Sequence, residues 1–237
     1  MHAFQAQELV GSIVARHPAL SRVFERAGID YCCGGKRTLE EACRSKGIDT
    51  EEILLRLDAA TKSEGNEPQV ASMSLSELTN HIESVHHAYL RAELPRLDAI
   101  TAKVASVHGE SEPRLREIRS VYEDLMQEIY AHMLKEERVL FPMVRALESG
   151  SASACFTCGT LEHPIRQMEH EHEWVGNALQ SLRQLSGDYT PPDWACNTYR
   201  AMLDGLAHLE RDFHQHIHKE NNVLFPRASD LERRRSA

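Results

Sequence analysis

The stretch His132-Met-Leu-Lys-Glu136-Glu-Arg-Val-Leu-Phe-Pro142 returns 84 residues later as His216-Ile-His-Lys-Glu220-Asn-Asn-Val-Leu-Phe-Pro226. Each copy places a glutamate four residues after a histidine and ends in Leu-Phe-Pro. Residues four apart lie on the same face of an α-helix, so each copy presents one imidazole and one carboxylate in the same direction. Two such helices facing each other bring these groups to one buried point. The repeat therefore predicts a metal site.

The repeat extends upstream to single histidines. His87 lies 45 residues before His132, and His172 lies 44 residues before His216. Each half is thus a helix with one histidine, a connection, and a His-x-x-x-Glu helix, which predicts a four-helix bundle. Six ligands with carboxylates that can bridge suit two metal ions, and imidazole mixed with carboxylate favours iron or manganese over structural zinc. The expected ligands are His87, His132, Glu136, His172, His216 and Glu220.

Apolar residues share the helix faces of the two motifs. Since these rows face a core, the ligands are expected in a low-dielectric interior, where histidine and glutamate are costly unless paired or metal-bound. The first row holds Leu125, Ile129, Glu136, Val139 and Leu140 around His132. The second holds Leu209, Phe213, Glu220, Val223 and Leu224 around His216.

Acidic residues also recur one turn before each motif histidine. Glu128 precedes His132, and Asp212 precedes His216. Either residue is a charge on the helix surface or an acceptor that orients an imidazole or relays protons, and the sequence leaves both readings open. Further histidines one or two residues from the expected ligands should point to other faces. These are His86, His170, His214 and His218.

The composition fits a soluble, mainly helical protein. The 237 residues suffice for one ordinary domain and a small one, and 27% are charged but only 6% aromatic. A net charge of −9 argues against a nucleic-acid partner, despite the short basic run Arg233-Arg234-Arg235. Neither a run of 18 apolar residues nor a secretion signal is apparent, so we expect no membrane span and a cytoplasmic location. The six cysteines are then expected to be reduced.

The chain is expected to divide into a small helical domain at residues 1–62, a linker at 63–73 and the bundle at 74–237. The linker is polar and contains Gly65 and Pro68. Long helices are predicted at about 74–107, 113–147, 164–185 and 193–225, with Pro142 kinking the second helix or ending its regular part.

The small domain contains Asp30-Tyr31-Cys32-Cys33-Gly34-Gly35-Lys36. A helix expected to open at Thr38, with the basic residues before it, would lower a thiol pKa and make Cys32 or Cys33 reactive. Two small packing residues at a turn are an equally good interpretation. Cys155 and Cys158 form a single Cys-x-x-Cys pair, a weak redox candidate, whereas Cys43 and Cys196 look like packing cysteines.

The Asp-Tyr-Cys-Cys-Gly-Gly-Lys segment followed by two His-x-x-x-Glu-x-x-x-Leu-Phe-Pro motifs resembles the YtfE/ScdA-like RIC (Repair of Iron Centers) family of di-iron proteins. The resemblance covers nearly the whole chain. It implies a haemerythrin-like bundle with a non-haem di-iron centre and an oxo-type bridge, held by the six ligands named above, with Glu136 and Glu220 bridging the irons. Glu128 and Glu171 match acidic positions that line the family's site.

The resemblance also implies a function, which is to help repair iron–sulfur clusters damaged by nitric oxide or oxidants. The expected partners are damaged or apo iron–sulfur proteins, with nitric oxide or oxygen as small ligands. A homodimer and the role of the Cys155 and Cys158 loop are left open. A di-iron enzyme that reduces nitric oxide to nitrous oxide, or a module that senses oxygen or nitric oxide, would use the same site residues. Enzymatic activity is therefore not decided by the sequence.

Overall fold

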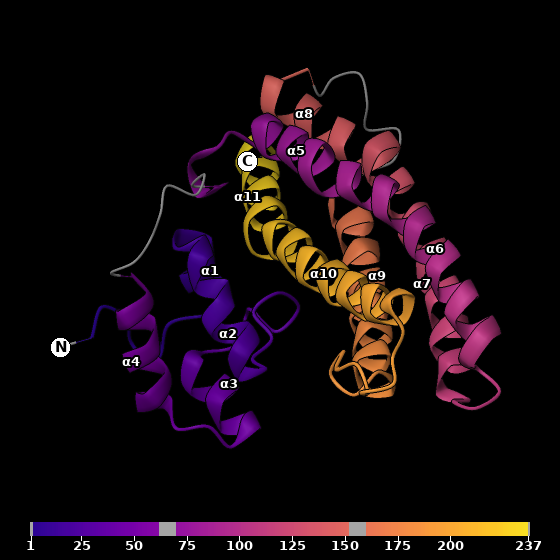
Figure 1. Ribbon diagram of the computed structural model, residues 1–237. Coiled ribbons are helices and arrows are strands. Elements are labelled where there is room, and N and C mark those ends of the chain that lie inside the picture. Colours follow the sequence, from indigo (N-terminus) through magenta and orange to yellow (C-terminus); the bar gives the residue numbers. More distant parts are fainter. Residues whose placement is uncertain (1, 62–69, 152–159, 237) are drawn as a thin grey trace. The chain divides into compact units, whose positions relative to one another are not determined.

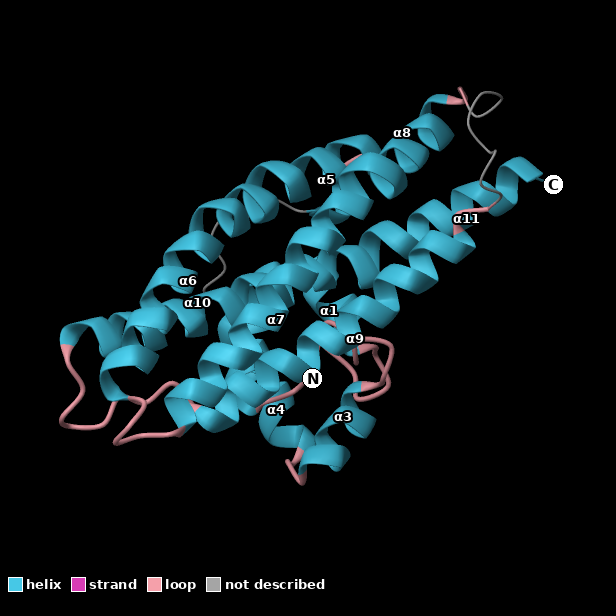
Figure 2. Ribbon diagram, turned by 90° about the vertical axis from the view of Figure 1, so that its right-hand side faces the viewer, coloured by secondary structure: helices cyan, strands magenta, loops and turns pink. Residues whose placement is uncertain are grey.

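The computed structural model describes residues 2–61, 70–151 and 160–236, and this part of the chain is almost entirely helical (Figures 1 and 2). Over these residues no β-strand forms, and Leu9 and Thr38 make an isolated antiparallel bridge. The predicted all-α fold is confirmed. A search of the described helices finds none with the length and apolar character needed to cross a membrane.

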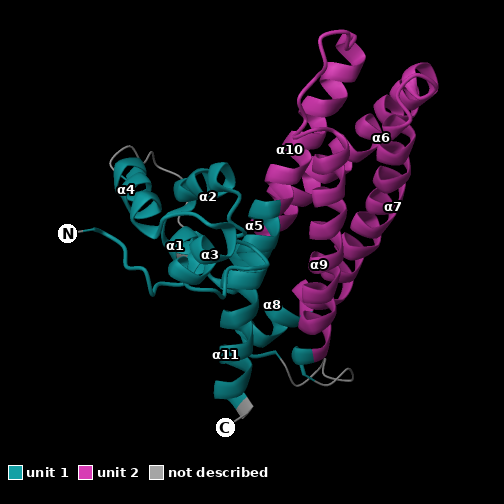
Figure 3. Ribbon diagram, turned by 90° about the horizontal axis from the view of Figure 1, so that it is seen from below, with its two compact units in different colours: residues 1–79, 143–162, 214–237 teal, residues 80–142, 163–213 magenta. Residues whose placement is uncertain are grey.

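The chain folds into two compact units (Figure 3). The bundle unit comprises residues 80–142 and 163–213. The amino-terminal unit comprises residues 1–79 together with 143–162 and 214–237.

Four long helices make the bundle unit: α6 (Ala88–His108), α7 (Arg114–Lys135), α9 (Glu162–Leu185) and the larger part of α10 (Asn197–Lys219). Each buries an apolar row at helical spacing, which confirms the predicted four-helix bundle. The fully or almost fully buried side chains include Leu90, Leu94, Leu97, Leu125, Ile129, Val175, Leu179, Leu206, Leu209 and Phe213.

Three π-helical turns interrupt the long helices, at Glu83–His87, Glu136–Leu140 and Glu220–Leu224. In the two repeated motifs the amide of the following phenylalanine donates to the carbonyl of the motif glutamate, five residues back. The next residue in both copies is a proline, which has no N–H to give to the carbonyl four residues before it. A widened turn accommodates that loss without ending the helix. Beyond the turns, α8 (Phe141–Ser149) and α11 (Phe225–Ser236) continue the helical path.

The π-turn explains an error in the predicted apolar row. Val139 was expected to face inward, but 44% of its surface is exposed, whereas the next residue, Leu140, is buried. An extra residue in the turn rotates everything after Glu136 relative to a regular helix. Val223, at the same place in the second copy, is buried, and the helix α1 (Val10–Arg16) packs against its turn in the amino-terminal unit.

The amino-terminal unit builds a core of its own from α1, α2 (Ser21–Ala27), α3 (Leu39–Lys46) and α4 (Thr50–Thr61). Thr38 opens α3 with the predicted capping box, in which its hydroxyl and the Glu41 carboxylate each accept from the other's backbone amide. The large buried side chains of this core are Phe4, Val10, Ile13, Leu20, Phe24, Tyr31, Leu39, Ile53 and Leu57.

Within the linker expected at 63–73, residues 62–69 lie outside the described part of the chain. The remainder includes a short 3-10 helix, Val70–Ser72. A second 3-10 turn, Pro18–Leu20, joins α1 to α2. Helix α5 (Leu75–Ile82) then leads into the first π-turn.

The loop that carries Cys32 and Cys33 is fastened to the last part of the chain within the same unit. The amide nitrogen of Asn222 donates to the carbonyls of Tyr31, at 3.3 Å, and Cys32, at 2.9 Å. Nδ1 of His218 lies 3.3 Å from the same Tyr31 carbonyl. The approach is close because Gly35 has no side chain: a Cβ there would lie 2.5 Å from Oδ1 of Asn222 and 2.6 Å from the Tyr31 carbonyl.

We therefore expect Gly35→Ala to destabilise the protein by about 1–3 kcal/mol, the usual cost of overpacking. The control is Gly176→Ala on α9, where nothing lies within 4 Å of the added Cβ. That change should stabilise by about 0.5–1 kcal/mol, because alanine favours a helix. Urea unfolding of both variants measures the difference. Equal stabilities would contradict the close approach at Gly35.

Candidate metal centre

Three buried side chains meet inside the bundle unit. The ligand atoms of His132, Glu136 and His172 lie within 4.8 Å of one another, and all three residues have no exposed surface. Nε2 of His132 is 3.4 Å from Oε1 of Glu136 and 3.1 Å from Nε2 of His172. Two imidazoles and a carboxylate from α7, its π-turn and α9 thus lie together at a fully buried position.

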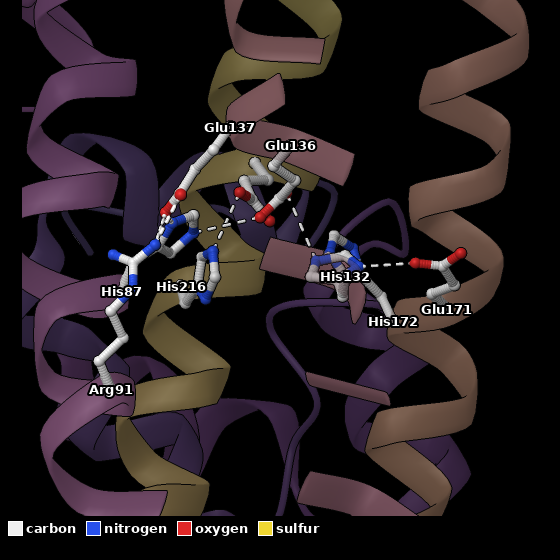
Figure 4. A network of polar contacts seen from close by, with 9 residues as sticks. His87, Arg91, His132, Glu136, Glu137, Glu171, His172 and His216 are labelled. Atoms are coloured by element: carbon white, nitrogen blue, oxygen red, sulfur yellow. Dashed lines mark hydrogen bonds and ion pairs between the residues drawn. The ribbon is translucent and has the colours of Figure 1, made fainter. Parts of the chain in front are cut away.

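His87, at the end of the first π-turn, joins the same carboxylate from its other side. Its Nε2 lies 3.2 Å from Oε2 of Glu136, and the imidazole is fully buried. Its second nitrogen, Nδ1, is 2.6 Å from Oε1 of Glu137. Arg91 in turn holds Glu137 through two contacts of 2.6 Å. Figure 4 shows this chain of contacts from Arg91 to Glu136.

Glu171 contacts the His132 imidazole at Nδ1, as Glu137 contacts His87. Its Oε2 is 2.9 Å from Nδ1 of His132 (Figure 4). Lys135 and Gln167 bind its other oxygen. Burial by itself would raise the pKa of Glu171, but hydrogen bonds from His132, Lys135 and Gln167 outweigh it and hold the pKa at about 2. Glu171 is therefore ionised, and its partner nitrogen must carry the proton.

The carboxylates of Glu137 and Glu171 determine which nitrogen of each imidazole can bind a metal ion. With Nδ1–H of His132 donating to Glu171, and Nδ1–H of His87 donating to Glu137, each Nε2 keeps its lone pair. Both Nε2 atoms lie beside Glu136. This pairing of a carboxylate with the far nitrogen of a histidine is the usual support for a metal ligand. Buried nitrogen and oxygen donors without thiolate fit iron.

The second motif lies in the amino-terminal unit. There Nε2 of His216 is 3.0 Å from Oε1 of Glu220, and both residues are fully buried. His216 stands on the last turns of α10, and Glu220 begins the third π-turn. The i,i+4 geometry expected from the repeat is present in both copies.

Of the outer acidic residues, Glu171 was expected, but the others differ from those expected. Glu137 was missed, since the second copy has Asn221 at the equivalent position and the repeat gave no signal. Glu128 is half-buried on α7, and its side chain makes no hydrogen bond or ion pair with any described residue. Asp212 binds Nδ1 of His86 at 2.9 Å, so it orients a neighbouring histidine and not the expected ligand.

The pKa of the Cys32 thiol is shifted opposite to the direction expected from the helix start, and the prediction that one of the two adjacent thiols is reactive stays a prediction. Hydrogen bonding with Cys33, burial, and the nearby Asp30 carboxylate raise the pKa of Cys32 well above the ordinary value. Sγ of Cys32 is 3.2 Å from Oδ1 of Asp30.

The remaining cysteines divide into three groups. Cys43 is buried, as expected of a packing residue. Cys196 is exposed, which corrects the same expectation, and backbone amides at the start of α10 together with His108, 3.4 Å from Sγ, lower its pKa. Cys155 and Cys158 lie outside the described residues.

Among the four described cysteines, we expect Cys196 to be alkylated fastest at neutral pH, since it is exposed and its pKa is lowered. His108→Ala should slow the reaction several-fold by removing one of the groups that favour the thiolate. Mass spectrometry after brief iodoacetamide treatment gives the rates. Faster labelling of Cys32 than of Cys196 would contradict the assignment.

Comparison with known proteins agrees with both parts of the fold. Residues 78–228 match the model described as hemerythrin HHE cation binding domain, and residues 6–61 match ScdA_N, a domain of unknown function. The relatives include proteins named iron-sulfur cluster repair protein YtfE from Yersinia pseudotuberculosis serotype IB (strain PB1/+) and Yersinia pestis, each 35% identical over 92% of this chain and 95% of the relative. A third, from Yersinia pseudotuberculosis serotype O:1b (strain IP 31758), is 34% identical over the same shares.

The chain belongs to the YtfE family of iron–sulfur cluster repair proteins. The YtfE-family match spans the cysteine segment and the bundle, so the resemblance seen in the sequence is confirmed over nearly its whole length. The cation-binding description of the bundle domain agrees with the buried histidine and glutamate donors. Together they indicate an iron centre in this YtfE-family chain.

Proposed function

We propose that the chain binds two iron ions and helps to repair iron–sulfur clusters damaged by nitrosative or oxidative stress. The ligand set is His87, His132, Glu136, His172, His216 and Glu220. The bundle unit supplies four of these groups, the Glu136 carboxylate and the three imidazoles near it. The repeated motif assigns the other pair, His216 and Glu220, the same role. The hemerythrin match covers all six.

The side chains around these ligands prepare the site. Glu137 and Glu171 hold two imidazoles in the tautomer that offers Nε2, and Arg91 and Lys135 offset the charge of the outer carboxylates. Full burial of the inner groups keeps water away from them. Glu136 and Glu220 would be the bridging carboxylates, as the resemblance to the family implies. Bound iron supplies a redox-active and exchangeable metal.

Iron itself is also the proposed cargo. We propose that ferrous iron passes from the protein to an apo or damaged iron–sulfur protein, and that nitric oxide or oxygen binds at the same centre. The name of the relatives supports repair over the alternatives of a nitric oxide reductase or a sensor.

Anaerobic transfer of iron tests the proposal most directly. Iron-loaded protein is mixed with an apo iron–sulfur enzyme, sulfide and a reductant, and recovery of enzyme activity is followed. Recovery faster than with the same amount of free Fe²⁺ plus iron-free protein is expected. Multiple turnovers of nitric oxide to nitrous oxide, without such recovery, would instead establish the reductase.

We also propose that the bundle, from about residue 74 on, folds and holds iron without the first domain. A chain beginning at Ser72 should remain helical and load iron as the full chain does, because residues 1–62 contain none of the six ligands. Deletion does uncover the surface of Asn222, so reduced stability is expected. A folded chain that cannot be loaded would show that the two parts depend on each other.

A further inference from the structure

A second set of metal donors lies in the amino-terminal unit, on the loop before α3. The ligand atoms of Asp30, Cys32 and Cys33 lie within 4.8 Å of one another. Two thiols and a carboxylate suit a borderline divalent cation such as Fe²⁺, Co²⁺ or Zn²⁺, unlike the thiol-free donors of the bundle. Cys32 is buried, Cys33 is half-buried and Asp30 is exposed, so the group opens to solvent at one edge.

We propose that Asp30, Cys32 and Cys33 form a second metal site, which binds one divalent cation through two thiolates and one carboxylate. Binding takes up one cation and releases two thiol protons to solvent, and no oxidation state changes. Three protein ligands leave a fourth position open, as in sites whose metal or bound molecule exchanges.

The groups around the Cys32 thiol favour the binding of a cation. The Cys32 thiol is held between Asp30 and Cys33, in an arrangement where each negative charge disfavours the next. A cation removes this conflict, because it binds the deprotonated thiols. Nearby, Nε2 of His218 is buried and has no hydrogen-bond partner among the described residues, although its ring packs on Tyr31.

The loop is also tied to the helix that carries the second motif. His218 and Asn222, which hold the loop at Tyr31 and Cys32, are each two residues from Glu220 in sequence. Movement of the π-turn at Glu220 therefore acts on the loop that bears the thiols. The existence of this site does not depend on the proposed function. Only the identity of its natural cation, which we take to be Fe²⁺ leaving the bundle, rests on that function.

Cobalt is the probe, because thiolate bound to Co²⁺ gives a strong charge-transfer band in the near ultraviolet. Full-length, iron-loaded protein is titrated anaerobically with Co²⁺ while proton release is measured in weak buffer. We expect a band that saturates at one Co²⁺ per chain and two protons per ion. C32S and C33S should each abolish the two-thiolate band, and D30N should weaken binding. The matched control C196S, at an exposed thiol elsewhere, should change neither.

The outcomes separate this site from the bundle centre. E220L should lose iron yet keep the cobalt band, so failure of the six-ligand assignment leaves this test intact. No thiolate band in the wild-type protein overturns the proposal. A band that persists in the C32S/C33S double variant and disappears in C155S/C158S overturns it as well, since other cysteines then hold the cation. Circular dichroism establishes that each variant is folded.

Discussion

Replacing Glu136 or Glu220 by leucine should strip the protein of iron. Each carboxylate is fully buried beside a histidine. Oε1 of Glu136 lies 3.4 Å from Nε2 of His132, and Oε1 of Glu220 lies 3.0 Å from Nε2 of His216. Leucine fills a similar volume but offers no donor, and it leaves two ions without a shared ligand. Loss of a residue that only hydrogen-bonds to a metal ligand typically lowers metal affinity about 10–100-fold, so loss of a bridging ligand should lower it more. Metal analysis after anaerobic loading and desalting measures the occupancy.

Glu128→Leu is the matched control for this experiment. The substitution is the same and lies on α7, one turn before His132, but the side chain of Glu128 makes no hydrogen bond to any described residue. It should leave iron occupancy unchanged. Glu137→Gln should give an intermediate loss, because it weakens the hold on His87 without removing a ligand. Two irons per chain in both leucine variants would defeat the ligand assignment.

The repeated motif was enough to predict the bundle and the inner donors, because histidine and glutamate four residues apart are unusual on apolar helix faces. Sequence periodicity does not reveal a π-turn, since it assumes a constant angle per residue. That assumption predicted a buried Val139, which is partly exposed. It also gave no reason for the proline that ends both motifs, which the π-turn accommodates. His87, Glu136 and Glu220 each lie in one of these π-turns, so the widened turns carry three of the proposed ligands.

Residues that act from another part of the fold were harder to predict. Glu137 supports His87 across 50 positions in sequence, and nothing local distinguishes it from a surface glutamate. Glu171 was expected only through family resemblance, and the structure places it on His132. For Cys32, a local argument from the helix start gave the wrong direction of the pKa. The hydrogen bond with Cys33, the burial and the nearby Asp30 carboxylate that raise this pKa depend on the folded loop.

The double variant C32S/C33S should keep the iron of the bundle and yet fail to restore a nitric-oxide-damaged iron–sulfur enzyme in cells. Neither cysteine is among the six proposed ligands, so the absorption spectrum and iron content should match those of the wild-type protein. Serine keeps the size of cysteine but loses most of its metal affinity. Recovery of enzyme activity after a pulse of nitric oxide should fall to that of cells lacking the protein.

Two comparisons give this result its meaning. C196S, which removes an exposed thiol outside the loop, should repair as well as the wild-type protein. D30N keeps both thiols but weakens the three-donor group, so repair that falls with D30N points to metal binding by the loop. Repair that is lost in C32S/C33S but intact in D30N points to the thiols themselves. Full repair by the double serine variant would reduce both cysteines to packing residues, because the buried Cys32 would then serve only the loop that Asn222 fastens to the helix.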